Sequence, residues 1–201
     1  MEYLLLGFLT SLSLILAIGA QNIFVIEQGL KKQYIFIVCL ICSVSDGVLI
    51  FIGLFLFHYF NQYFNPTVEL IFNILLLIFL IHFIYSKIKS RNNTMDFNQS
   101  NKEIPLKSII FKTLGFTYLN PHVYSDTVFF LGNFSKNFLT FEKIKFGVGA
   151  SLASFLFFFL IGYMAKYFSK YANNKKIWKY INYSIITFMS ILVLYIFLSI
   201  I

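Results

Sequence analysis

The chain has 201 residues, of which 59% are apolar, 20% are aromatic and only 12% are charged. No soluble domain of this length can hide so much apolar surface, so the composition excludes a soluble protein and indicates a membrane protein. The net charge of +8 does not indicate nucleic-acid binding, because the basic residues lie in the gaps between apolar stretches and not on one surface.

Six stretches have the length of about 20 apolar residues that crosses the hydrocarbon core as a helix. They are Leu4–Ile26, Tyr34–Phe57, Val68–Ser86, Ser108–Leu131, Phe146–Phe168 and Ile177–Ile201. We therefore predict an all-α membrane protein with six transmembrane helices and a single domain over residues 1–201. Residues 1–86 form a first three-helix half, the polar stretch 87–107 a cytoplasmic linker, and residues 108–201 a second three-helix half.

The first span is interrupted by Gly19, Ala20, Gln21 and Asn22, a flexible glycine and two amides inside an apolar run. The small residues in Ala17-Ile18-Gly19-Ala20 have a spacing that resembles a signal-peptide cleavage site. Glu2 stands where such a peptide has basic residues, however, so we expect the stretch to be a span of the mature protein.

The second span carries Cys39, Cys42 and Asp46. Redox or metal chemistry at the cysteines would need exposure and further ligands, so we interpret them as thiols that pack between helices. An Asp at a helix centre costs about 2.5–3.5 kcal/mol if charged, so it should face the bundle interior and either pair with a cation or take up a proton.

The fourth span is interrupted by Asn120, Pro121 and His122, and Asp126 follows one helical turn later. Pro121 removes a backbone donor, and Asn120 can satisfy the groups that are freed. No Lys or Arg at membrane depth is an obvious partner for Asp46 or Asp126. The alternative to a functional role is a pair of protonated acids bonded to hydroxyls such as those of Ser43, Ser45 or Tyr124.

Both breaks lie in the first span of their half, and Asn22 and Asn120 are 98 residues apart. Such correspondence is typical of an inverted repeat, whose discontinuous helices meet at a central binding site. Taken singly, Gly19 would be a packing notch and Pro121 a simple kink. The acids do not follow the repeat, since the region equivalent to Asp46 holds none. The fifth span has a face of small residues that we interpret as packing only: Gly147, Gly149, Ala150, Ser151, Ala153 and Ser154.

Thirteen of the sixteen Lys and Arg residues lie in or beside the first, third and fifth gaps. By the positive-inside rule these gaps are cytoplasmic and both termini lie outside.

Three motifs resemble the lysine exporter (LysE) family of bacterial inner-membrane transporters, in particular its lysine- and arginine-exporting branch. They are GAQNIFVIEQG at 19–29, SDGVLI at 45–50 with Gly53, and LNPHVYSDT at 119–127 continuing to Leu131 and Gly132. His122 is similar to the basic amino acid branch, whereas the related homoserine and threonine exporters more usually carry Lys there. The chain departs from the family pattern at Ser125, where an aliphatic residue is more usual, and at Glu27, where a basic or neutral residue is expected.

The resemblance implies export of L-lysine or L-arginine by a multi-pass protein of the inner membrane. The substrate carboxylate could bind free N–H groups at the start of a half-helix following Asn22 or Asn120. Asp46 and Asp126 are the candidates for holding the substrate cation and a proton alternately. Gln21, Asn22 and Asn120 would be neutral hydrogen-bonding partners, and His122 a proton relay, beside the break at Pro121.

We thus expect a proton antiporter and not an enzyme. Its partners are a small-molecule substrate, protons and the lipid bilayer, with no cofactor, no metal and no nucleic acid. The sequence is compatible with either a monomer or a homo-oligomer. The alternatives are an exporter of another small amino acid, an exporter of a divalent metal cation, which should show clustered carboxylates, His or Cys, and a membrane enzyme or assembly subunit.

Overall fold

A computed structural model describes residues 1–16, 19–63, 66–90, 105–172 and 175–200. Within these ranges all regular structure is helical and no strand occurs, which confirms the all-α class. The helices in chain order are α1 (Glu2–Ile15), α2 (Ala20–Lys31), α3 (Ile35–Tyr63), α4 (Pro66–Ser90), α5 (Leu106–Tyr118), α6 (Pro121–Tyr124), the π-helix η1 (Ser125–Phe130), α7 (Leu131–Phe134), α8 (Thr140–Ala172) and α9 (Lys175–Ile200).

Three stretches of the described chain are long and apolar enough to cross a membrane as one helix: Ile35–Phe57, Thr140–Lys170 and Lys179–Leu198. They overlap the predicted second, fifth and sixth spans, and the fifth begins at Thr140 instead of Phe146. The first predicted span is a broken one, in which α1 and α2 meet at 83°. The third contributes a shorter apolar stretch, Asn73–Tyr85, and the fourth is divided among α5, α6, η1 and α7.

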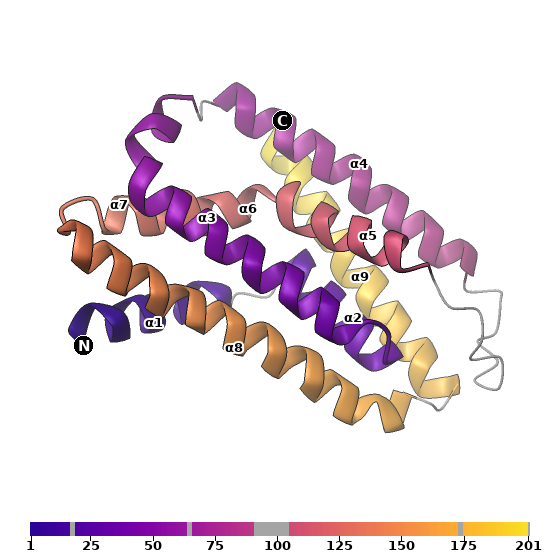
Figure 1. Cartoon of the computed structure of the whole chain (residues 1–201). Coiled ribbons are helices and arrows are strands. Elements are labelled where there is room, and N and C mark those ends of the chain that lie inside the picture. The colour runs from indigo at the N-terminus through magenta and orange to yellow at the C-terminus, as the bar shows by residue number, and fades with distance from the viewer. Residues whose placement is uncertain (17–18, 64–65, 91–104, 173–174, 201) are drawn as a thin grey trace.

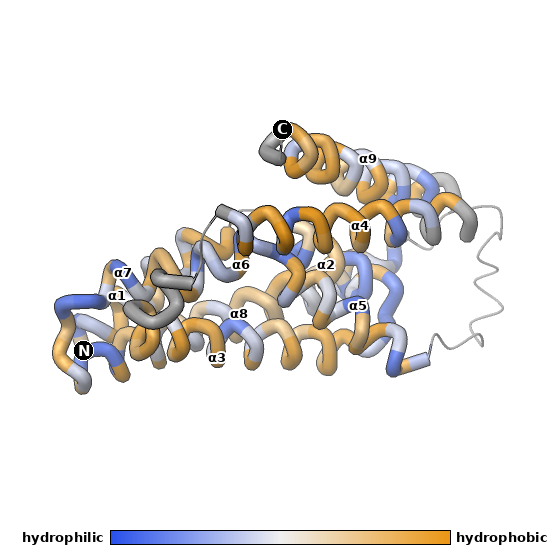
Figure 2. Tube along the Cα trace, turned by 90° about the horizontal axis from the view of Figure 1, so that it is seen from above, coloured by the Kyte–Doolittle hydropathy of each residue, from blue (hydrophilic) through white to orange (hydrophobic). Residues whose placement is uncertain are grey.

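Helices α2, α5 and α6, which belong to the two broken spans, lie between two layers of helices. Seen from above, α4 and α9 form one side of the molecule and α3, α8 and α1 the other, with α2, α5 and α6 between them (Figure 2). Helix α8 packs along α1, α2 and α3, and α4 packs against α9 (Figure 1). The residues around the breaks at Asn22 and Asn120 are therefore enclosed in the protein.

The contact between α1 and α8 depends on glycines. A Cβ built on Gly7 would lie 2.0 Å from the carbonyl oxygen of Phe146, and one built on Gly149 would lie 2.0 Å from that of Leu4. Two backbones can approach this closely only where side chains are absent. The expectation that small residues of the fifth span permit close helix contact is confirmed here.

Aromatic rings join the two broken spans. Phe24 of α2 stacks on Phe116 of α5 with ring centroids 4.8 Å apart, and Phe83 of α4 packs edge-on against both rings. All three side chains are buried. This cluster fixes α2 against α5 and holds both against the α4 layer, because large buried rings dominate the energy of such contacts.

The structure covers the ends of the predicted linker 87–107. Helix α4 continues to Ser90, four residues into it, and α5 begins at Leu106 after Pro105. Residues 91–104 lie outside the described part of the chain.

Candidate functional site

Asp46 lies on the inward face of α3, with 5% of its surface exposed. The hydroxyl of Ser154 in α8 donates a hydrogen bond to Asp46 Oδ2 at 3.1 Å. The other carboxylate oxygen, Oδ1, is buried and has no hydrogen-bond partner among the described residues. No Lys or Arg of the described chain pairs with this acid. One oxygen of Asp46 is thus fixed by the protein, and the other is able to accept from a further donor.

The break in the first span places an uncapped helix start beside Asp46. Helix α2 begins at Ala20 after Gly19, which is extended and makes no side-chain cap. Gln21 is buried in the first turn of α2. Its side-chain amide lies near Asp46 and Cys42, but its nitrogen Nε2 makes no hydrogen bond in the described chain. The packing-notch interpretation of Gly19 is wrong, because a Cβ built there would meet nothing within 4 Å.

Asn22 spans the same break with its side chain. Its Nδ2 donates to the carbonyl oxygen of Ile15, the last residue of α1, at 3.1 Å. A helix end leaves carbonyl groups without intrahelical partners, and a buried one needs a donor from elsewhere. Asn22 therefore stabilises the end of α1 from within α2.

The break in the fourth span is closed by its own side chains. Asn120 is extended, and its Oδ1 accepts from the backbone N–H of His122 at 3.1 Å, with Pro121 at the first position of α6. The hydroxyl of Tyr124 donates to the carbonyl oxygen of Tyr118 at 2.9 Å, across the break. The prediction that Asn120 satisfies a group freed near Pro121 is confirmed.

Asp126 lies in the π-helix that follows and is half-buried. It is close enough to interact electrostatically with Asp46 on one side and His122 on the other. His122 itself is exposed, and its ring stacks on Tyr195 of α9 with centroids 6.4 Å apart. The sequence did not predict the wide π turn, a feature that occurs frequently at functional sites.

The structure thus brings Gln21, Asp46 and Asp126 together from three helices. The hydroxyl partners considered for the acids are wrong in two cases, because Ser43 donates to the carbonyl of Cys39 and Tyr124 to that of Tyr118. The hydroxyl that does reach Asp46 belongs to Ser154. The interpretation of Ser154 as a packing residue only is therefore wrong.

The two cysteines pack as expected. Cys39 and Cys42 are free thiols with no exposed surface, and Cys39 Sγ donates to the carbonyl oxygen of Phe158 at 3.2 Å. The described residues contain no group of three or more His, Cys, Asp and Glu side chains placed to hold a metal ion.

A separate charged pair lies further along α2. Glu27 is 1% exposed and forms an ion pair with Lys31 one turn later, while Lys112 of α5 is close enough to act on both electrostatically. Glu27 is thus partnered within its own helix, in contrast to Asp46.

Comparison with known proteins identifies the family. The family model described as LysE type translocator matches residues 12–199, nearly the whole chain. The chain belongs to the LysE type translocator family. No solved structure matches it.

Curated relatives of this LysE-type chain carry more specific names. It is 32% identical over 182 residues to a protein of Pectobacterium atrosepticum named arginine exporter protein ArgO, covering 88% of this chain and 87% of the relative. An identically named protein of Salmonella typhimurium is 30% identical over 184 residues, covering 90% and 86%. The family and the apolar helices together make this chain a multi-pass membrane protein.

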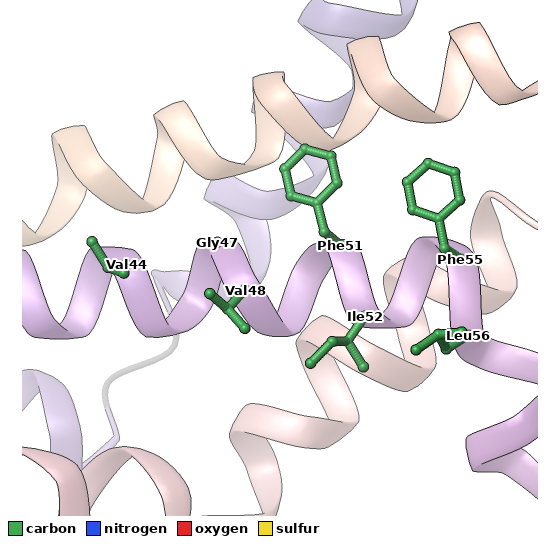
Figure 3. Close-up of a pocket in the computed structure, with 7 residues that line it drawn as sticks. All are labelled: Val44, Gly47, Val48, Phe51, Ile52, Phe55 and Leu56. Carbon is green, nitrogen blue, oxygen red and sulfur yellow. The ribbon is translucent and has the colours of Figure 1, made fainter.

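The outer surface of α3 agrees with that setting. A groove of about 680 Å³ runs along α3 and is lined only by apolar residues and one glycine (Figure 3): Val44, Gly47, Val48, Phe51, Ile52, Phe55 and Leu56. In a LysE-type translocator this surface can face lipid acyl chains without a free-energy cost for buried polar groups, because none of these side chains is polar. Asp46 is directed the other way, into the protein.

Proposed function

We propose that this chain exports basic L-amino acids, arginine or lysine, across the bacterial inner membrane in exchange for protons. The observation that carries the proposal is Asp46, a buried acid without a basic partner in the described chain, beside an uncapped helix start. A chemical group with both a cation and an anion matches that combination. The relatives named arginine exporters cover the part of the chain that contains it.

The substrate carboxylate is assigned to the start of α2. The first N–H groups of a helix have no intrahelical partner and the helix dipole is positive there, so an anion binds favourably. Gly19 supplies no side-chain cap for these groups in α2. In α6 the side chain of Asn120 already accepts from one of them, which makes that break the weaker candidate.

The cationic groups of the substrate are assigned to Asp46 and Asp126. Asp46 Oδ1 has no donor within the described chain, and Asp126 is close enough to share the charge. Gln21, Asn22 and Asn120 supply neutral hydrogen-bonding groups around them, the break at Pro121 holds Asp126 in place, and His122 relays protons to that acid.

Exchange for protons follows from the energetics of moving a cation outward. Expelling one positive charge from a cell that is negative inside costs about 2.3 kcal/mol per 100 mV. A proton moving inward on the same carboxylates cancels this electrical work. The two acids then hold the substrate cation and the proton in alternation.

The architecture that suits this cycle is a 3+3 inverted repeat of six spans with breaks in the first and fourth. The odd-numbered gaps, which carry most of the lysines, face the cytoplasm, and both termini face outward. Helices α2 and α5 would then be the inner halves of the two broken spans.

Counterflow in proteoliposomes tests the proposed substrate class. Vesicles that contain the purified protein and unlabelled arginine inside should accumulate external radiolabelled arginine and lysine transiently. Vesicles loaded with homoserine, and vesicles without protein, serve as controls. Equal counterflow with homoserine, or none with arginine and lysine, would contradict export of basic amino acids.

A further inference from the structure

Buried hydroxyls in this protein generally bond within their own helix. Ser43, Thr113, Thr117 and Thr127 each donate to the carbonyl oxygen four residues earlier, at 2.5–2.9 Å. This is the usual pattern for Ser and Thr in helices, because that carbonyl is always within reach. Ser154 departs from it: its Oγ donates to Asp46 Oδ2 on a different helix, 108 residues away in the chain.

The contact is enclosed on both sides. Ser154 is 1% exposed and Asp46 is 5% exposed, so no bulk solvent competes for the hydrogen bond. A carboxylate held at one oxygen cannot rotate freely about its Cβ–Cγ bond. Its second oxygen, Oδ1, then keeps one direction, and it is the oxygen for which the described chain supplies no donor.

Preorganisation of this kind affects binding more than turnover. A ligand that finds the carboxylate already oriented does not have to order it, so less of its interaction energy is lost on binding. Removing the hydroxyl would let the carboxylate adopt several rotamers and would remove one donor from its charged form. Both effects weaken the binding of a cation at Oδ1.

We propose that Ser154 is a positioning residue for substrate: its hydroxyl fixes Asp46 through Oδ2, so that Oδ1 receives the cationic group of the basic amino acid. This inference rests on the proposed function. It adds a residue from α8 to a site otherwise built from α2, α3, α6 and η1, and it gives the two oxygens of Asp46 different roles.

The chain offers a matched control on the same helix. Ser151 lies one turn before Ser154, and a Cβ built on Gly47, the neighbour of Asp46, would lie 3.5 Å from its Oγ. That oxygen is buried but has no hydrogen-bond partner in the described chain. Ser151→Ala and Ser154→Ala therefore remove the same hydroxyl oxygen at positions one helical turn apart, and only the second removes a hydrogen bond to the site.

The test is export of radiolabelled arginine from loaded proteoliposomes as a function of internal concentration. For Ser154→Ala we expect the half-saturating concentration to rise about tenfold, the size expected for losing a hydrogen bond to a charged group, with the maximal rate within about twofold of wild type. For Ser151→Ala we expect both values to be unchanged. A second pair, Ser154→Thr and Ser154→Val, matches in shape and differs only in the hydroxyl, so Thr should retain the low half-saturating concentration and Val should not.

Each outcome decides a separate question. If wild type exports arginine and the Thr and Val variants have the same half-saturating concentration, Ser154 only packs and the inference is overturned. A change of equal size in Ser151→Ala would overturn it too, because a general effect on helix packing would explain both. If wild type exports neither arginine nor lysine, the proposed function fails first and this inference fails with it.

Discussion

The breaks in the first and fourth spans look alike in the sequence, but their asparagines satisfy opposite kinds of backbone group. At the first, Asn22 donates to the carbonyl oxygen that α1 leaves unpaired at its end, and the start of α2 has no side-chain cap. At the fourth, Asn120 accepts from the N–H that α6 leaves unpaired at its start. One asparagine therefore satisfies a helix end and the other a helix beginning.

This difference suggests a division of labour between the breaks. In the proposed mechanism the start of α2, where Gly19 makes no side-chain cap, binds the substrate anion next to Gln21 and Asp46. The fourth is closed by its own side chains and instead presents a carboxyl group, Asp126, on a π-helical turn. A zwitterion with an additional cation would use both, with its carboxylate at the first break and its cationic groups between the two acids.

The largest effect is expected from the acids. Asp46→Asn and Asp126→Asn keep the size of the side chain and abolish its charge, so export of arginine should fall about 100-fold or more in each, as when a buried charge loses its partner. The folded state should persist, which thermal unfolding of the purified variants would check. Near-normal export by Asp46→Asn would make Asp46 a structural acid and would remove the first break from the site.

A smaller loss is expected at Pro121. In Pro121→Ala the backbone N–H returns and the ring no longer blocks helix continuation, so α5 and α6 can straighten and displace Asp126. Export should fall by about tenfold to 100-fold, since a misplacement of about 1 Å can cost up to about 100-fold in rate, while the protein remains folded. Pro105→Ala is the control, because Pro105 is exposed and precedes α5 away from the site. Full export by Pro121→Ala would reduce the proline to a simple kink.

How much of this site the sequence predicts depends on the kind of residue. Asp46, Asn120 and Pro121 stand out because polar and helix-breaking residues are costly at membrane depth. Ser154 does not stand out, since a serine among glycines and alanines is common on a packing face and only the fold brings it to Asp46. A hydroxyl partner chosen by proximity in sequence, such as Ser43, is wrong because its own helix offers a nearer carbonyl.

The same distinction holds for the fold. Long, mainly apolar runs such as Tyr34–Phe57 predict α3 well, because composition alone decides that a helix forms in lipid. The sequence predicts the fourth span as one helix with a break, whereas the structure divides it among α5, α6, η1 and α7. The π turn lies where α3 and η1 approach closely: a Cβ on Gly53 would lie 2.7 Å from the carbonyl oxygen of Thr127. Such a contact between distant segments leaves no periodic signal in the sequence.

Substitutions of the two asparagines test whether they play opposite roles at the two breaks. At 120 an acceptor is needed, so Asn120→Ser should retain the stability of the protein, whereas Asn120→Ala should lower the free energy of unfolding by about 1 kcal/mol. At 22 a donor is needed, so Asn22→Asp, which replaces the amide donor with an acceptor facing the Ile15 carbonyl, should destabilise more than Asn22→Ala. Denaturation of the purified variants measures this. Equal losses of stability in Asn120→Ser and Asn120→Ala, or a smaller loss in Asn22→Asp than in Asn22→Ala, would contradict the opposite roles.

The smallest effect on export is expected from cysteine substitutions that serve only as labelling sites. They report on which side of the membrane each broken span begins or ends. Lys32→Cys at the end of α2 and Leu106→Cys at the start of α5 should both react only from the cytoplasmic side, and Leu139→Cys before α8 from the outside. All three positions are exposed, and the native cysteines are fully buried, which makes wild type the unlabelled control. Reaction of Lys32→Cys and Leu106→Cys from opposite sides would rule out an inverted repeat.

The exchange of a basic amino acid for protons is tested most directly by recording the internal pH of arginine-loaded proteoliposomes. When arginine flows out through the wild-type protein, protons should flow in, and a pH-sensitive dye inside the vesicles should report acidification that Asp46→Asn abolishes. Arginine efflux through wild type without any change in internal pH would contradict the proposed exchange.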